Sequence, residues 1–438
     1  MIKTLNLALI ALFLASSPGL FGQFLTSGGS ARSTAMAGAY TPAADNVLDA
    51  MASNPAGLAL INAPWVDIAV MGGLATGDYT NSVNSAGRLN SIGGIPYGAF
   101  GTPLGKHISI GVAALPELLS DARWNYADPK GGAGSVSYGQ LHSVSSITAV
   151  RTAFGAGIYL GSRVQIGATV GTTYNTNELN TAYVFQNYQP LAGLKTLLTL
   201  RTAGYGWNGT AGVLVRASLN LRLGASWHSK TSIRSTGQAA GNAGVQFAAI
   251  GLGGARPDFR YNAEVDNILP QSVSLETIWQ ATSKFQVVAQ MDWINWGSAF
   301  QTLPVILTKG NNADINGLLG TNAFSDSIPV NWHDQAIERI GVSRDWSEHG
   351  VLRAGYAHAN TPVPGSTLSP LTAAITRHTI SAGAGYSVGR WLFEAAYSID
   401  PAVSESNGTS ALKSGEFSNT RVSVSTQMVV LTTSLRLR

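Results

Sequence analysis

Apolar and polar residues alternate over many stretches of the chain, and this period of two predicts β-strands. From Val164 to Tyr174 every second residue is apolar, threonine or tyrosine, whereas the residues between them are glycine or polar. The same alternation occurs in residues 219–228 and 391–400. A strand between lipid and the lumen of a membrane barrel has this character, with one apolar face and one small or polar face.

About fourteen such strands, each of about 10 residues, fit the chain after residue 64. Short connections (102–106, 161–162, 281–283, 347–349, 388–389) alternate with long ones (78–91, 118–140, 178–196, 237–258, 301–331, 361–376, 401–416). Outer-membrane barrels have short periplasmic turns and longer external loops. The pattern therefore predicts an all-β fold, a transmembrane antiparallel β-barrel of about 14 strands.

Composition supports a membrane barrel. Charged residues make up 11 % of the chain, against about 25 % in typical soluble proteins. Outside the N-terminus no stretch reaches 18 apolar residues, so a membrane could be crossed only by a closed barrel. Ten tryptophans, Trp124, Trp296 and Trp332 among them, lie near the expected strand ends. This placement favours aromatic girdles at the two membrane interfaces.

The first 64 residues do not alternate. Lys3 and the apolar stretch from Leu5 to Ala15 predict a secretory signal peptide over residues 1–22, and with it an outer-membrane location. Residues 23–64 are rich in small residues, with two helical stretches (31–39 and 45–52) and a turn at Asn54-Pro55. We expect residues 23–64 to form a plug inside the lumen, and residues 65–438 to form the barrel.

At this plug the sequence resembles the FadL family of outer-membrane transporters for long-chain fatty acids and hydrocarbons. Residues 29–40, then Asp45-Asn46, then Asn54-Pro55-Ala56-Gly57-Leu58 are similar to the family's hatch and its Asn-Pro-Ala motif. Residues 269–273, 332–334, 339–341, 352–356 and 381–386 fit later segments in the same order. The resemblance implies a hatch gated by Asn54, Pro55 and Ala56, with Arg32 as a further hatch residue.

The resemblance also implies a route for the ligand. An apolar external surface captures it, a lumen pocket holds it, the hatch moves, and the ligand leaves sideways where the third strand kinks. Gly111 and Pro116 are the kink candidates, because a proline cannot donate to the sheet and belongs at an edge or bulge. The apolar residues of two long loops are the capture candidates: Phe185, Tyr188, Leu191, Leu194, Val245, Phe247 and Ile250.

The predicted function is therefore passive, gated uptake of hydrophobic molecules, with long-chain fatty acids first and aromatic hydrocarbons as the alternative. A general diffusion porin would lack the plug. An outer-membrane lipase would need a catalytic serine, and Gly385-Tyr386-Ser387-Val388-Gly389 matches G-x-S-x-G but falls at a short turn rather than in an α/β sheet. We therefore expect no enzyme.

Cofactors and other partners follow from the same composition. With no cysteine and scattered histidines, no metal site or cofactor is expected. A net charge of +4 without basic runs argues against nucleic acid. The expected partners are a hydrophobic ligand, outer-membrane lipid and lipopolysaccharide, and the barrel-assembly machinery, for a monomer. The chain ends in Leu435-Arg436-Leu437-Arg438 instead of the aromatic residue usual in such barrels.

Overall fold

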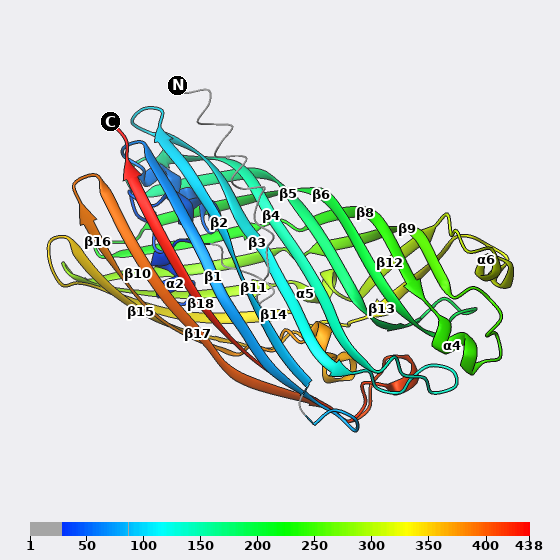
Figure 1. The fold of residues 1–438 in the computed structure, drawn as a ribbon. Helices are drawn as coiled ribbons and strands as arrows, with labels where there is room; N and C mark the ends of the chain where they lie inside the picture. The colour runs from blue at the N-terminus through cyan, green and yellow to red at the C-terminus, as the bar shows by residue number, and fades with distance from the viewer. Residues whose placement is uncertain (1–28, 86) are drawn as a thin grey trace.

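The computed structural model describes residues 29–85 and 87–438, which form one closed antiparallel sheet around an N-terminal segment (Figure 1). The expected signal peptide, residues 1–22, lies outside the described residues. Among the described residues, no helix has the length and apolar character needed to cross a membrane.

The chain runs along the barrel from one end to the other fourteen times, and these fourteen crossings form the wall. Six crossings are single strands: β1 (Trp65–Thr80), β2 (Gly87–Pro103), β3 (Ile108–Ala127), β4 (Gln140–Leu160), β5 (Val164–Val184) and β6 (Lys195–Arg216). Four are split in two: β7 (Leu221–His228) with β8 (Thr231–Asn242), β9 (Asp258–Leu269) with β10 (Ser272–Thr282), β11 (Phe285–Ile294) with β12 (Thr302–Thr308), and β13 (Phe324–Pro329) with β14 (Gln335–Asp345). The last four are β15 (Gly350–Ala359), β16 (His378–Val388), β17 (Trp391–Asn407) and β18 (Thr420–Arg436). Strand β18 pairs with β1 over the whole of β1 and closes the barrel.

The strands are longer than the sequence pattern predicted. Strand β6 has 22 residues, whereas a tilted membrane crossing needs about 9–11. Residues 118–127 and 178–184, expected in long loops, belong to β3 and β5. The excess lies at the end that carries the long connections, together with α4 (Gly244–Ala249) and α6 (Ala313–Leu319) (Figure 1). The wall therefore continues beyond the membrane on its external side.

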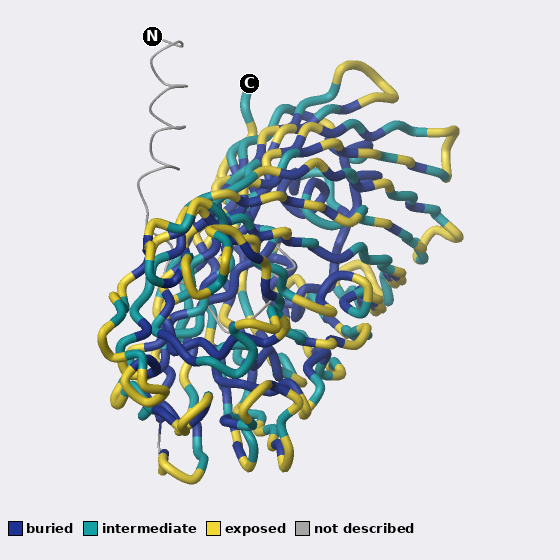
Figure 2. Tube along the Cα trace, turned by 90° about the vertical axis from the view of Figure 1, so that its right-hand side faces the viewer, coloured by how far each residue is buried: buried dark blue, intermediate teal, exposed yellow. Residues whose placement is uncertain are grey.

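Burial alternates along most strands, as the period of two requires (Figure 2). Large apolar residues are exposed on the outer face. Trp279, Trp346 and Trp391 lie there near the short turns, and they suit one interfacial girdle. Three other tryptophans contradict the girdle prediction, because they are buried inside the lumen: Trp124, Trp296 and Trp332.

The N-terminal segment, residues 29–64, lies inside the barrel near the end with the short turns (Figure 1). It contains α2 (Ala31–Ala35), α3 (Val47–Ala52) and the 3-10 helix η1 (Pro55–Leu60). Side chains of Ser30, Asn46 and Asn54 cap these three helices, as short polar residues commonly do. We call this segment the hatch. Its helices agree with the two predicted stretches, although α2 ends four residues earlier than expected.

Candidate functional site

An apolar cavity of about 160 Å³ lies at the external end of the barrel, between the ends of β5 and β6 and the strands β12 and β13. Its lining includes Phe185, Leu198, Leu307, Ile328 and Phe417. The connections after β15 and β17 close its other side. Ligand sites are typically concave and mainly apolar, with a few polar groups. We call this space the capture cavity.

Asp326 of β13 fixes the segment that follows β5 over the capture cavity. Its carboxylate accepts a hydrogen bond from the Tyr183 hydroxyl at 2.6 Å. It also accepts backbone N–H bonds from Gln186 at 2.8 Å, Asn187 at 2.6 Å and Tyr188 at 3.0 Å. These donors leave the sheet at the end of the strand and would otherwise lack a partner. One carboxylate thus holds the segment that carries several predicted capture residues.

A smaller hollow of about 40 Å³ lies between the connection after β5 and the helices α4 and α6. Four of the seven predicted capture residues line it: Phe185, Leu191, Leu194 and Phe247. Tyr188 stacks beside it on Phe324, with ring centroids 4.9 Å apart. Val245 and Ile250 line neither space and are 41 % and 37 % exposed. Phe185 lines both spaces, so the hollow and the capture cavity are neighbours.

A buried lysine ties the external connections together. The Lys195 ammonium is fully buried and lies 2.7 Å from carboxylate oxygens of both Asp128 and Glu416. Its backbone N–H donates to the Gln246 side chain of α4 at 2.8 Å. Burial raises the pKa of Glu416 to about 7, and the lysine offsets only part of that rise. Burial raises the pKa of Asp128 as well.

The charged residues that line the capture cavity are all acidic: Glu178, Asp326 and Glu416. Glu178 is paired with Arg201 and Glu416 with Lys195, and both cations lie outside the lining. No lysine, arginine or histidine is among the described residues that line it. A ligand carboxylate would therefore meet the Asp326 carboxylate, and the cations nearest to the cavity already have acidic partners.

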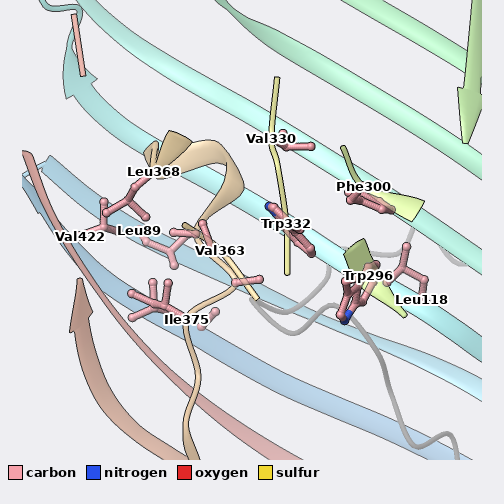
Figure 3. Close-up of a cluster of buried hydrophobic side chains, with 14 of the residues drawn as sticks. Leu89, Leu118, Trp296, Phe300, Val330, Trp332, Val363, Leu368, Ile375 and Val422 are labelled. Atoms are coloured by element: carbon pink, nitrogen blue, oxygen red, sulfur yellow. The ribbon is translucent and has the colours of Figure 1, made fainter. Parts of the chain in front are cut away.

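A cluster of aromatic rings packs in the lumen next to the lining of the capture cavity, and we call it the aromatic floor (Figure 3). The strand β11 ends in the short helix α5 (Trp296–Ala299), which turns into the lumen. The ring centroid of Trp332 lies 5.0 Å from that of Trp296 and 4.9 Å from that of Phe300. Leu118 of β3 packs in the same cluster, and so does Ile328 of the cavity lining. The aromatic floor therefore connects the cavity with β3.

Strand β3 loses its pairing with β2 next to Pro116 but stays paired with β4 as far as Ala127. Its pairing with β4 shifts by one residue between Pro116 and Leu118, so Glu117 is an extra, bulged residue. Residues 90–97 of β2 and 115–123 of β3, all of them described, form no pair with each other. Residues 118–121 are all buried, which places this part of β3 inward of the wall. The Ser91 hydroxyl still donates to the Asp121 carboxylate across the gap.

The kink expected at Gly111 is not observed. Gly111 pairs in continuous register with Gly101 of β2 and Gly155 of β4. A Cβ atom at Gly111 would lie 3.0 Å from side-chain atoms of Met51 and Leu58 of the hatch. The absence of a side chain at Gly111 therefore leaves room for the hatch, and the irregularity of β3 belongs to Pro116 and Glu117.

Polar residues of the lumen hold the bulge in place. The Glu117 carboxylate lies 2.8 Å from Nε2 of His228 and accepts a hydrogen bond from Thr173. Glu117, His228 and Arg151 line a second cavity of about 150 Å³. Pro116 of β3 and Ser53 of the hatch border the same space. This polar cavity lies where the wall gap and the hatch meet.

The predicted hatch residues are all buried and bonded to the wall or to each other. The Asn54 side chain donates to Glu276 of β10 at 2.9 Å and caps η1, which begins with Pro55 and Ala56. Arg32 forms ion pairs with Asp45 at 3.0 Å and with Glu394 of β17 at 3.2 Å. Two further inward-facing arginines have partners too: Arg339 pairs with Asp292, and Arg353 with Glu394.

The sequence profile of the family "outer membrane protein transport protein (OMPP1/FadL/TodX)" matches residues 11–437. The chain belongs to this family. It is an outer-membrane β-barrel of a family that transports hydrophobic molecules. No curated protein sequence matches the chain.

Solved structures show the same fold as this FadL-family chain at low sequence identity. A FadL homologue of Pseudomonas aeruginosa is 16 % identical, with a TM-score of 0.76 over 95 % of this chain and 100 % of its own. The toluene transporter TodX of P. putida is 17 % identical, with a TM-score of 0.74 over 94 % and 99 %. The monoaromatic hydrocarbon channel CymD is 15 % identical, with a TM-score of 0.65 over 95 % and 99 %.

Several residues of this FadL-family site were not found from the sequence. Asp326, Lys195 and Glu416 lie in stretches without alternation, and their partners are far away in the chain. Glu117 follows Pro116 directly, so the proline gave the correct neighbourhood but not the bulged residue. The end of the strand before Trp296 could have been predicted, because Asn295 can cap a helix and so interrupt a strand. The interpretation of the tryptophans as an interfacial girdle led away from this prediction.

The surroundings of Ser387, the serine of the G-x-S-x-G match, differ from those of a catalytic serine. Ser387 lies at the end of β16, one residue before the strand ends, and its hydroxyl donates to the backbone oxygen of His349 at 3.4 Å. A nucleophile elbow requires a strand-to-helix turn. Within residues 29–85 and 87–438, no group of three or more histidine, aspartate or glutamate residues could hold a metal ion.

Proposed function

We propose that the chain takes up neutral hydrophobic molecules of about the size of one aromatic ring. The capture cavity carries this proposal, because it is mainly apolar and has a volume of about 160 Å³. An engineered apolar cavity of about 150 Å³ in another protein stays dry and binds benzene. A monoaromatic ring therefore matches the volume of the capture cavity.

The charges around the cavity favour a neutral ligand over an anion. All three charged residues that line the cavity are acidic, and the nearby cations Arg201 and Lys195 already pair with carboxylates. Transfer of a carboxylate into such surroundings costs desolvation and adds repulsion between like charges. Related barrels named as toluene transporters or as a monoaromatic hydrocarbon channel support the same class.

The ligand's proposed path follows the structure from outside inward. Phe185, Leu191, Leu194 and Phe247 capture the ligand, and the capture cavity accepts it. Movement of the aromatic floor and of β3 near Pro116 then lets it leave through the gap between β2 and β3. The hatch closes the periplasmic end. Every step is passive, since the apolar ligand moves towards the membrane interior down its own gradient.

Long-chain fatty acids are the second candidate. The small hollow and the capture cavity share Phe185, so an extended acyl chain could occupy both. A fatty acid would bring its carboxylate close to the cavity's acidic residues unless the head group stays outside. The sequence-based preference for fatty acids is therefore replaced here by neutral aromatic compounds.

Uptake by cells tests the proposal. Host cells without their own transporter would carry this chain or an empty vector, and uptake of labelled toluene, benzoate and a long-chain fatty acid would be compared. We expect uptake of toluene above the vector background and none of benzoate, which differs by its charge. Uptake of the fatty acid without toluene would contradict the proposal.

A pair of variants checks the capture site in the same assay. Phe247→Ala removes a ring that lines the small hollow, and we expect a several-fold fall in uptake at low ligand concentration. Val245→Ala, in the same helix but outside both spaces, is the matched control. Contact with lipopolysaccharide, insertion by the barrel-assembly machinery and a monomeric state remain predictions from the sequence.

A further inference from the structure

Three charged side chains from distant parts of the chain meet at one point in the external end of the barrel. Lys195 begins β6, Asp128 follows the end of β3, and Glu416 precedes β18. The Lys195 nitrogen lies 2.7 Å from Oδ1 of Asp128 and 2.7 Å from Oε2 of Glu416. The exposed fractions of these side chains are 0 %, 3 % and 4 %. An amine and two carboxyl groups are thus held in contact, with little access for solvent.

The cluster does not balance its charges when all three groups are ionised. One ammonium and two carboxylates leave a net negative charge in a buried place, and an unpaired buried charge is costly. Burial raises the pKa of Glu416 to about 7, and it raises the pKa of Asp128 as well. One carboxyl is therefore readily protonated at neutral pH. Since both carboxyl oxygens lie 2.7 Å from the same nitrogen, a proton can move among the three groups without leaving the cluster.

The two carboxyl groups differ in their surroundings, and each is suited to a different role. The second oxygen of Asp128, Oδ2, accepts a hydrogen bond from the backbone N–H of Tyr138 at 2.8 Å. Such a donor stabilises the negative charge that develops on oxygen when a nucleophile attacks the carboxyl carbon. A proton-transfer group works best when its pKa is close to the working pH, as that of Glu416 is. Glu416 also lines the capture cavity, which gives released water a way out.

We propose that Lys195 and Asp128 form an amide bond between their side chains, with Glu416 as the group that transfers the protons. Glu416 first moves a proton from the ammonium to Oδ1 of Asp128. The neutral amine, which is a nucleophile, attacks Cγ, and a C–N bond forms. Glu416 then moves a second proton from the nitrogen to the same oxygen, which leaves as water when the Cγ–Oδ1 bond breaks. Glu416 ends in its starting form, and the step needs no oxidant.

The amide fits the surroundings of the cluster. Its nitrogen keeps one hydrogen, and the backbone oxygen of Pro129, 2.7 Å from the lysine nitrogen, can accept it. Its oxygen, the former Oδ2, keeps the hydrogen bond from Tyr138. Two buried charges disappear in the reaction, so the desolvation cost of the ion pair is removed.

The bond would join the connection after β3 to the start of β6, on the external side of the barrel. A cross-link of this kind stabilises a fold as a disulfide does, because it restricts the unfolded chain. The chain has no cysteine, so a disulfide cannot take this role. The amide therefore keeps the external end closed around the capture cavity. In chains that have not formed the bond, the same three groups act through their charges alone.

Peptide mapping of the unmodified barrel, purified from outer membranes, tests the bond without any ligand. Trypsin cuts after lysine and arginine, so an unlinked chain releases residues 124–130 and residues 164–195 as separate peptides. The bond blocks cleavage after Lys195 and joins residues 124–130 to residues 164–201. We expect this branched peptide, lighter than its two parts together by one water molecule. Recovery of the separate peptides alone would overturn the proposal.

The same map distinguishes the roles of the two acidic residues. Fragmentation of the branched peptide should place the bond at Asp128. A branch to residues 414–421, which contain Glu416, would refute the assigned roles. Chains recovered unfolded from inclusion bodies should contain no branched peptide, because the three groups meet only in the folded barrel. An equal yield from unfolded chains would show that the cluster does not promote the bond.

Two glutamates that each pair with a cation give a matched pair of variants. Glu416→Gln keeps the size of the side chain but cannot transfer protons. It should slow the formation of the branched peptide during refolding by roughly 100-fold, at the lower end for general acid–base catalysis. Glu264→Gln, whose partner Arg234 is 71 % exposed, should leave the rate unchanged. Equal rates in the two variants, each folded as judged by heat-dependent mobility on gels, would exclude Glu416 as the proton-transfer group.

Discussion

Replacing Lys195 by methionine would test whether one buried cation holds the capture cavity together. Methionine keeps the apolar stem of the side chain but removes the ammonium group. Asp128 and Glu416 would then remain buried without their shared partner, since both lie 2.7 Å from the lysine nitrogen. Loss of one partner of a buried ion pair typically costs about 3–5 kcal/mol.

Proton uptake reduces that cost. The pKa of Glu416 is already about 7 because of burial, so this carboxyl can be neutral at pH 7 with little loss. Asp128 carries most of the remaining penalty. We therefore expect the closed arrangement of the external connections to lose about 3 kcal/mol at pH 7, on the scale of a broken buried pair. That change corresponds to a shift of roughly 100-fold between closed and open arrangements.

Binding of toluene to the detergent-solubilised barrel would measure the effect. The apparent affinity falls by the fraction of molecules in which the cavity is formed, so Lys195→Met should bind more than tenfold more weakly at pH 7. At pH 5 both carboxyls bind protons more readily, and the defect should shrink. Limited proteolysis should cut the connections after β3 and β17 faster in the variant.

The control is Arg256→Met. Arg256 pairs with Asp314 at 3.3 Å, but the two side chains are 68 % and 38 % exposed. Exposed pairs contribute little to stability, so this variant should bind as the unmodified protein does. Equal, small effects of both substitutions would refute the reasoning, because they would show that the burial of Lys195 has no energetic consequence.

Three further predictions concern the same path. The Glu416 carboxyl has a pKa of about 7 in the closed arrangement, above its ordinary value of 4.5, so its contribution to closure is fully present below pH 4.5 and is lost as the pH rises to 7; toluene affinity should fall between about pH 4.5 and pH 7, level off above that, and become less pH-dependent in Glu416→Gln. Cysteines at Ser91 and Asp121, joined by a short reducible thiol cross-linker, should stop uptake until the bridge is reduced; unchanged uptake would exclude an exit between β2 and β3. Phe185→Ala should join the small hollow to the capture cavity and favour larger ligands in a competition assay between toluene and naphthalene, whereas an unchanged preference would show that the two spaces do not cooperate.

The barrel could be predicted from the sequence because its determinants are local. Alternation depends on residues two positions apart, and the length of each connection is visible directly. The helices of the hatch were also predictable, since Asn46 and Asn54 are helix-capping residues close to the stretches they cap. These signals need no knowledge of which strands are neighbours across the lumen.

The external half was less predictable because it leaves the membrane. There the outer faces of β5 and β6 no longer need apolar residues, so the alternation fades and strand was taken for loop. The proposed capture residues Phe185, Leu191, Leu194 and Phe247 could be named as apolar loop residues, but their common hollow requires α6 and β13, whose positions depend on distant pairing. The same applies to Lys195, whose two acidic partners are 67 residues before it and 221 residues after it in the chain.

The loss of pairing between β2 and β3 coincides with a break in the alternation of burial along β3. In a regular strand, outward residues meet lipid and inward residues meet the lumen. Strand β3 breaks this separation from Leu118 to Asp121, where successive residues are all buried. There the strand has turned inward and its pairing with β2 is lost. We propose that the ligand leaves the lumen at this place, because the lost pairing lies beside the polar cavity.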